Sequence, residues 1–377
     1  MAFSVFALPD HSVCGNVSQV IPTTLQQALQ TLEWCQAVEL EAAGLVAEQC
    51  FEPVDLPVGC KILPCIWVFE RKRDGRAKAR FCVGGHRQVA GRDFYEFKNY
   101  TSVLHCRDNR ILLALAASNS WHVFQSDIQQ AFLSGKLDDA DIFINPFHGV
   151  PCSPDKVLKL RKAVYDLRQA PAKFKEELLS FFQQEGFVPA TDSQSVFIKR
   201  SPRGVHINAL YVDDCLHFTD NPDLFREFRL SFEKRFKIKV GPADLYLGNQ
   251  LHISRPTGTV SMSQEAYIDS VLDRFDMSGC AGVSTPIVAR LSAKEMGNAH
   301  ERYRALIGSL WYVSVWSRPD IAFALSELSR FVASPGTTHL QAAKHLLRYL
   351  KATKHFSLTY SCQGSAPQIV IISIGGM

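Results

Sequence analysis

The chain has 377 residues and a mass of 42.2 kDa, which exceeds the roughly 100 to 200 residues of a typical domain and predicts two or three packed subdomains. Hydrophobic residues make up 46% of the chain and charged residues 21%, which excludes a wholly disordered or collagen-like protein. No apolar run reaches the roughly eighteen residues of a membrane-spanning helix, and no positive charge precedes the short apolar stretch at the N-terminus. The sequence therefore predicts neither a membrane span nor a secretory signal, and the cytosol or the nucleus is the default location.

The net formal charge of +4 is small, but the charges are unevenly distributed. Between Lys61 and Arg110 there are twelve Lys or Arg residues and five Asp or Glu residues. This excess indicates a polyanionic partner, with a solvated basic face as the alternative interpretation. The eleven cysteines have irregular spacing and no C-x-x-C pair, so we interpret them as mostly buried thiols rather than as a disulfide framework or a zinc site.

The first half of the chain predicts a lead-in helix, a basic hairpin and then alternating helices and strands. Thr23 or Thr24 is the expected N-cap of the first helix, and Asp74-Gly75 is a strong signal for the turn of the hairpin. Pro171 and Gly186 mark the beginning and the end of a later helix. In chain order, we expect a helix at 23–50, strands at 62–71 and 79–83, a helix at 108–118, a strand at 122–126 and a helix at 172–185.

The second half predicts a small sheet followed by helices. Its expected elements are strands at 195–200 and 205–218, a helix at 223–235, strands at 237–240, 246–253 and 259–262, and helices at 264–275, 301–317, 320–333 and 338–353. The order β-α-β-β-α-β predicts an α+β fold with a split-βαβ antiparallel sheet backed by helices. Pro286 is the best candidate for a linker. Four segments are expected, at 1–58, 59–285, 286–360 and 361–377, and the last of them reads as a truncated tail.

Three aspartates carry the chemistry that the sequence indicates. Asp213 and Asp214 follow Tyr211-Val212 at the centre of the expected hairpin, and Asp127 follows an earlier apolar strand. Adjacent carboxylates in apolar surroundings repel each other and lose hydration, so a cation is needed to offset them. Two Mg²⁺ ions about 4 Å apart could activate a hydroxyl and stabilise the leaving oxygen of a phosphoryl transfer. If the Y-x-D-D segment stood alone, the alternative to a metal site would be a simple polar turn.

The aspartates belong to seven blocks that follow one another along the chain. These are Trp67-Val68-Phe69 with Lys72-Arg73-Asp74-Gly75, Lys78-Ala79-Arg80, Asp127 to Leu133, Leu160 to Tyr165 with Gln169-Ala170-Pro171, Tyr211 to Asp214, Tyr246-Leu247-Gly248, and Tyr303 to Leu310 with Arg318-Pro319-Asp320-Ile321. In this combination and order the chain resembles the reverse transcriptase of copia-type LTR retrotransposons, which is part of a Pol polyprotein. Seven ordered blocks make this resemblance highly specific.

The resemblance implies a right-hand polymerase, with fingers and palm at 59–285 and a helical thumb or connection-like region at 286–360. It implies an RNA-directed DNA polymerase that adds dNTPs to a primed RNA or DNA template with two Mg²⁺ ions, for which Mn²⁺ is a possible substitute. Asp127, Asp213 and Asp214 would be the catalytic metal ligands, the first two more directly. Other implied partners are the RNase H and integrase regions of a full-length Pol. The implied location is the cytoplasm, in virus-like particles, with later access to the nucleus.

The resemblance also implies roles in substrate binding. Phe132 would lie beneath the incoming sugar as a steric gate, and Leu247 and Gly248 would position the primer end. The residues implied to bind the nucleotide are Lys72, Arg73, Lys78, Arg80, Phe132, Gln169 and Tyr211. Simpler alternatives stay open: core packing for Phe132, helix entry for Gln169, solvation for Lys72 and Arg73, and close strand packing for Gly248.

The chain departs from the family pattern at several positions. Asp166 stands where glycine is common, at a position where glycine would permit a positive φ, and Gly84-Gly85-His86-Arg87 replaces a more usual lysine-containing segment. The acidic RNase H segment expected after Tyr360 is missing, and no protease or integrase motif occurs. We therefore expect a fragment or a decayed copy. The alternative function is a noncatalytic nucleic-acid-binding remnant of the same origin.

Overall fold

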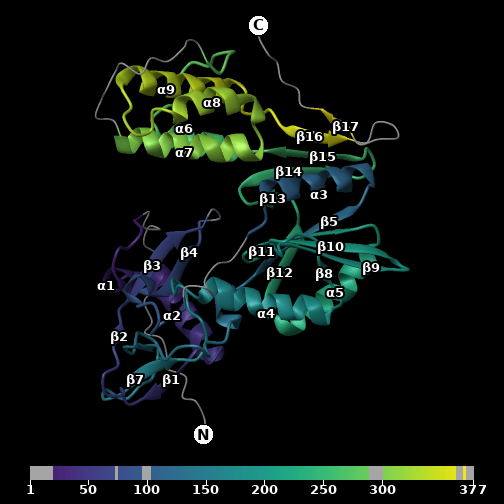
Figure 1. The fold of residues 1–377 in the computed structure, drawn as a ribbon. Helices are drawn as coiled ribbons and strands as arrows, with labels where there is room; N and C mark the ends of the chain where they lie inside the picture. Colours follow the sequence, from purple (N-terminus) through teal and green to yellow (C-terminus); the bar gives the residue numbers. More distant parts are fainter. Residues whose placement is uncertain (1–19, 73–74, 96–102, 288–299, 362–367, 371–377) are drawn as a thin grey trace. The chain divides into compact units, whose positions relative to one another are not determined.

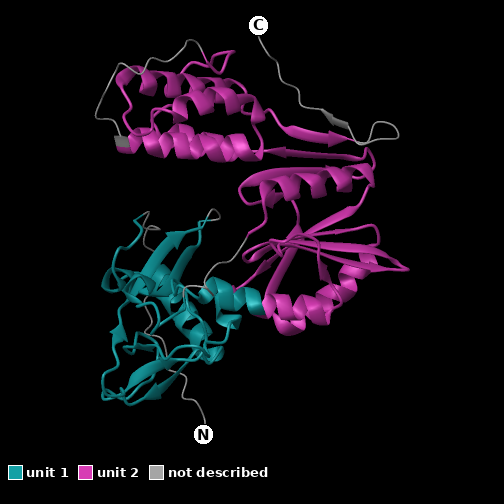
Figure 2. Ribbon diagram, in the orientation of Figure 1, with its two compact units in different colours: residues 1–100, 132–176 teal, residues 101–131, 177–377 magenta. Residues whose placement is uncertain are grey.

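The computed structural model describes residues 20–72, 75–95, 103–287, 300–361 and 368–370. The chain divides into two compact units (Figure 2). Unit 1 comprises residues 1–100 and 132–176, and unit 2 comprises residues 101–131 and 177–377. Unit 1 thus contains the expected lead-in segment and part of the segment expected at 59–285. Unit 2 contains the rest of that segment and everything after it. The four-segment division stays a prediction.

The lead-in region of unit 1 contains two helices where the sequence predicts one. They are α1, Leu25–Ala28, and α2, Leu32–Ala47. The predicted cap is confirmed, because the Thr24 side chain accepts a hydrogen bond from the amide of Gln27. The helix is interrupted because Thr31, a β-branched residue with low helix propensity, adopts an extended backbone before α2.

The predicted basic hairpin is present in unit 1. Strand β3, Cys65–Arg71, pairs antiparallel with β4, Ala77–Val83, and the residues next to the turn, Arg71 and Ala77, are opposite each other. Asp74 lies outside the described residues, and Gly75 has the positive φ of +83° that a tight turn requires. The α2 helix covers one side of the hairpin, with Trp34 edge-on to Phe69.

A small four-stranded sheet in unit 1 was only partly foreseen. Its order is β1-β7-β6-β2, with β1 at Phe51–Val54, β7 at Val157–Leu160, β6 at Phe143–Ile144 and β2 at Ile62–Leu63. Runs of two to four residues are too short to show a period, which is why three of these strands escaped prediction. Short 3₁₀ helices lie at Gly85–Arg87 (η1) and Ala131–Ser134 (η3).

Unit 2 is built on a six-stranded antiparallel sheet (Figure 1). Its order is β12-β5-β11-β10-β9-β8, with β12 at Ile238–Pro242, β5 at His122–Ile128, β11 at Asp214–Thr219, β10 at Gly204–Tyr211, β9 at Val196–Ser201 and β8 at Val188–Pro189. The order β12-β5-β11-β10 is the predicted split-βαβ arrangement. The end of α4, Ala170–Gln184, and α5, Pro222–Arg235, pack together through Phe181 and Phe232.

The opposite face of this sheet packs on α3, Cys106–Ser118, and on a second sheet. That sheet has the order β13-β14-β15-β16-β17, with strands at Leu245–Tyr246, Asn249–Ser254, Thr259–Ser263, Leu358–Ser361 and Gln368–Val370. Residues 368–370 of the expected tail therefore pair with β16, and residues 371–377 lie outside the described part of the chain.

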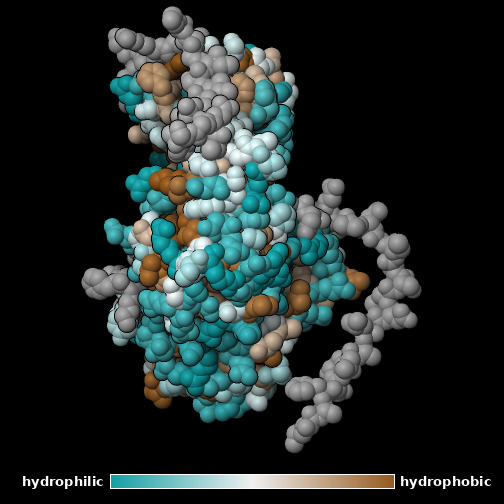
Figure 3. Space-filling view, turned by 90° about the vertical axis from the view of Figure 1, so that its right-hand side faces the viewer, coloured by the Kyte–Doolittle hydropathy of each residue, from teal (hydrophilic) through white to brown (hydrophobic). Residues whose placement is uncertain are grey.

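The C-terminal helices have their own hydrophobic core. They are α6 at Glu265–Arg274, α7 at His300–Trp316, η4 at Pro319–Ile321, α8 at Ala322–Ser329 and α9 at Thr337–Ala352. None of the helices in the described ranges is long and apolar enough to cross a membrane. The face drawn in Figure 3 is mostly hydrophilic, with apolar residues in small groups. The architecture as a whole is mixed α and β, in agreement with the predicted class.

The cysteines differ in burial from the prediction. The nine that lie in described residues are all free thiols, as expected, but only Cys50, Cys82 and Cys215 are fully buried. Cys60 is exposed, and the other five are half-buried. Burial raises the pKa of the Cys50 and Cys82 thiols to about 12, so these two groups stay protonated at neutral pH.

Candidate active site

The hairpin between β10 and β11 holds the predicted Y-x-D-D segment at its tip. Strand β10 ends at Tyr211 and β11 begins at Asp214, so Val212 and Asp213 alone form the connection. Val212 has φ +56°, which is an outlier for a β-branched residue and stores backbone strain. The amide of Ile128 on β5 donates to the carbonyl of Asp213 at 2.9 Å, which ties the tip to the neighbouring strand. The expected hairpin is therefore present, with a tight two-residue connection.

The strand register brings the predicted carboxylates together. Asp127 on β5 is directly opposite Asp214 on β11, and Tyr211 is opposite Asp214 on the other side. Directly opposed residues project from the same face, with Cβ atoms roughly 5 Å apart. Asp213 is exposed at the adjacent tip. Three acidic side chains from segments more than eighty residues apart thus share one end of the sheet.

The end of the sheet that holds the three aspartates disfavours negative charge on Asp214. Burial raises the pKa of the Asp214 carboxyl to about 6, with further contributions from the carboxylates of Asp213 and Asp127. The Gln125 amide, which donates to Asp214 Oδ1 at 3.5 Å, has the opposite and smaller effect. The position of Asp214, half-buried and close to two other carboxylates, therefore favours its protonated form.

This donor set fits a divalent cation that is shared with a substrate. Within the part of the chain that the structure describes, no three His, Cys, Asp or Glu side chains form a group that could already hold a metal ion. Mg²⁺ does not need such a preformed cage, because it commonly binds one or two carboxylates and takes its other oxygens from water and phosphates. Asp127 and Asp214, with Asp213 at the tip, supply hard oxygen atoms of this kind. The metal role of the three residues stays a prediction.

Two features near the carboxylates were missed from the sequence. On the β12 side, Lys239 is directly opposite Asp127, so a cation lies on the same sheet face. On the helix-covered face, Ser126 Oγ bonds to His217 Nε2 at 2.7 Å, and His217 Nδ1 bonds to Asn208 Oδ1 at 2.5 Å. This buried network crosses three strands beside the carboxylates. Polar residues inside apolar strands were the signal that could have indicated it.

The basic residues predicted to meet the triphosphate lie on the unit 1 hairpin. Lys78 and Arg80 alternate with the buried residues Ala79 and Phe81, so they share the other face of β4. Burial lowers the pKa of Lys78, and the positive charges of Arg80 and Lys72 lower it further. The structure thus brings together three of the four predicted cations, and the fourth, Arg73, lies outside the described residues.

Phe132 and Gln169, also in unit 1, are both held by packing. Phe132 is half-buried and makes edge-on ring contacts with Tyr165 and Phe174, at 5.5 and 6.3 Å between centroids. Gln169 is only 1% exposed, and its amide donates to the Asp93 carbonyl at 3.0 Å and accepts from Gln88 at 2.9 Å. The nitrogen and the oxygen of the Gln169 amide therefore both have hydrogen-bond partners within the protein. Roles of these residues toward a nucleotide stay predictions.

The segment predicted to position a primer is a two-residue hairpin loop in unit 2. Leu247 and Gly248, between β13 and β14, have φ values of +48° and +72°, as a type I′ turn requires at both central positions. Asn249 Nδ2 donates to the Leu247 carbonyl at 3.0 Å, and the hydroxyl of Tyr312 on α7 donates to the same oxygen. Glycine therefore has a conformational role here, beyond close packing.

Comparisons with known proteins identify the family of the chain. Residues 48–289 match the family described as reverse transcriptase (RNA-dependent DNA polymerase). The chain is 35% identical, over 92% of its length and 27% of the relative's, to the retrovirus-related Pol polyprotein from transposon TNT 1-94 of Nicotiana tabacum. It is 32% identical, over 89% of its length and 24% of the relative's, to the Pol polyprotein from transposon RE1 of Arabidopsis thaliana. The chain thus spans about a quarter of the length of these relatives.

Proposed function

The chain belongs to the reverse transcriptase family, as a region of a copia-type retrotransposon Pol polyprotein, and we propose that it is an RNA-directed DNA polymerase. The proposed reaction extends a primer on an RNA or DNA template by adding dNTPs. The observation that carries the proposal is the cross-strand pair of Asp127 and Asp214 beside the strained hairpin tip. Strain at a turn that presents carboxylates is typical of a functional site.

We propose that Asp127 and Asp213 hold Mg²⁺ most directly and that Asp214 supports them. When bound, the metal ions would supply Lewis-acid stabilisation of the phosphate oxygens and of the attacking hydroxyl. The protein's own part is positional. The Ile128 to Asp213 hydrogen bond and the strand register hold the carboxylates in place. The pKa of Asp214 is raised chiefly by burial and further by the neighbouring carboxylates, whose repulsion cation binding would relieve. In unit 1, the cations on β4 are proposed to meet the triphosphate and Phe132 the sugar.

Primer extension by the purified chain tests the proposal. The template is poly(rA), the primer oligo(dT), and the reaction contains dTTP with Mg²⁺ or Mn²⁺. We expect extension by the wild-type chain and a loss of at least about a thousandfold in Asp127→Asn and Asp213→Asn, because each removes a charged metal ligand. Asp192→Asn, the same change at an exposed turn residue, should leave extension unaltered. No extension together with salt-dependent duplex binding would instead favour the noncatalytic remnant.

A further inference from the structure

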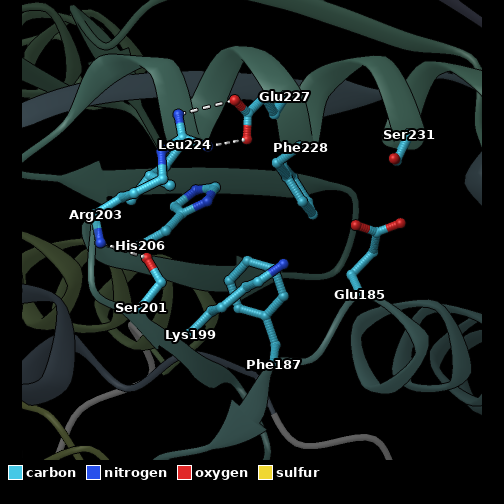
Figure 4. A pocket seen from close by; sticks show the side chains of 10 residues that line it. All are labelled: Glu185, Phe187, Lys199, Ser201, Arg203, His206, Leu224, Glu227, Phe228 and Ser231. Carbon is cyan, nitrogen blue, oxygen red and sulfur yellow. Dashed lines mark hydrogen bonds and ion pairs between the residues drawn. The ribbon is translucent and has the colours of Figure 1, made fainter.

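A cavity of about 300 Å³ lies in unit 2 between α5, strands β9 and β10, and the segment that follows α4 (Figure 4). It is on the helix-covered face of the six-stranded sheet, since His206, which lines it, contacts Phe228 of α5 with 5.0 Å between ring centroids. The carboxylates of the candidate active site project from the other face. The cavity is therefore separate from that site, and its volume is at the lower end of the range for small-molecule pockets, about 300 to 1,000 Å³.

His206 brings an unsatisfied polar atom to this cavity. The residue is 2% exposed, and its Nε2 atom is buried without a hydrogen-bond partner. Burial lowers the pKa of His206 to about 3, helped by the positive charge of Lys199, so the imidazole is neutral at physiological pH. A buried polar atom without a partner is costly, and few native proteins keep one without a reason.

Lys199 places a positive charge next to His206, and among the described residues this charge has no ion-pair partner. The two residues are directly opposite each other on β9 and β10. The Lys199 ammonium lies 5.6 Å from the ring centroid of Phe187, and none of the ion pairs among the described residues includes it. The other lining cation, Arg203, is neutralised by Glu227 at 2.9 Å, as Figure 4 shows. Among the described residues, the Lys199 ammonium, which has no ion-pair partner, and the unsatisfied Nε2 atom of His206 thus belong to neighbouring residues on paired strands.

We propose that this cavity binds a small aromatic carboxylate. In the tautomer of His206 that carries its proton on Nε2, one carboxylate can accept hydrogen bonds from Lys199 Nζ and from His206 Nε2 together, because the two side chains are cross-strand neighbours. The ring of the ligand then packs against Phe187 and Phe228, whose own rings lie 5.3 Å apart between centroids. The nearby carboxylate of Glu185 opposes the ligand's charge and limits its affinity.

The first test is ligand-observed saturation-transfer NMR on the full chain with three probes. Benzoate has the ring and the charge, benzyl alcohol has the ring alone, and acetate has the charge alone. We expect benzoate to bind with a Kd on the order of 1 mM, as its few heavy atoms allow, and the other two at least about tenfold more weakly. Absence of benzoate binding, or equal binding of acetate, overturns the proposal.

Variants then locate the binding site. Lys199→Met keeps the apolar stem and should weaken benzoate binding by about tenfold or more, because it removes the charge-assisted bond. His206→Phe should weaken it similarly, and Glu185→Gln should strengthen it. Lys234→Met, at an exposed position of α5, is the matched control and should change nothing. Circular dichroism verifies that each variant is folded. Unaltered affinity in a folded Lys199→Met overturns the proposal.

Discussion

The carboxylate pair at the end of the sheet predicts that Asp214→Asn stabilises the protein at neutral pH. The pKa of Asp214 is raised from 3.8 to about 6, chiefly by burial and then by its acidic neighbours. About two units correspond to at most roughly 3 kcal/mol, at 1.4 kcal/mol per unit. Because the side chain is partly exposed, solvent reduces this, and we expect a gain of about 1 to 2 kcal/mol in the free energy of unfolding.

The pH dependence gives the sign of the effect. Since the pKa in the folded state is above the value in the unfolded state, the favourable contribution of the protonated group is complete below about pH 4. It is lost as the pH rises through about 6. The advantage of the Asn variant should therefore be small at pH 4 and fully developed at pH 7.5.

Urea denaturation without divalent ions, followed by circular dichroism at pH 4 and pH 7.5, measures this difference. Asp192→Asn is the control, with the same chemical change at an exposed turn. Addition of Mg²⁺ at pH 7.5 should stabilise the wild-type chain more than Asp214→Asn, because the metal relieves the repulsion that the variant has already removed. The reasoning fails if Asp214→Asn is no more stable than wild type at pH 7.5.

Four further predictions concern single positions in the two units. Val212→Gly should raise the free energy of unfolding by about 1 kcal/mol, because glycine relieves the strain of a φ of +56°. It should nevertheless lower primer extension, because the hairpin tip loses rigidity. Melting and extension assays on Val212→Ala, which keeps the strain, provide the comparison. Asp166, at φ +69°, should tolerate Gly, whereas Ala should cost about 1 kcal/mol, as urea titration of both variants will show. Phe132→Ala should admit rNTPs as a sugar-gate role requires, whereas simple core packing predicts lower stability and joint loss of dNTP and rNTP incorporation. Lys78→Ala with Arg80→Ala should raise KM for dNTP, and an unchanged KM would remove both from the binding residues.

Local features of this protein could be predicted from the sequence because short-range sterics and hydrogen bonding decide them. The Thr24 cap, the turn at Gly75 and the end of the α4 segment at Gly186 all follow from the intrinsic preferences of these residue types. At Asp166, where the family commonly has glycine, the structure has a positive φ of +69°, a conformation that glycine adopts without strain. The break at Thr31 and the two-residue strands were missed because such signals are too short.

Only the tertiary structure decided which distant residues meet. Asp127 and Asp214 were candidates from the sequence, but their direct opposition depends on the register of β5 and β11, which the packing of both sheet faces sets. The register of β12 against β5 places Lys239 beside Asp127, and the register of β9 against β10 places Lys199 beside His206. A shift of one residue would turn each of these side chains to the other face. The cavity under α5 likewise exists only because helix and strands leave space between their side chains, which no local propensity determines.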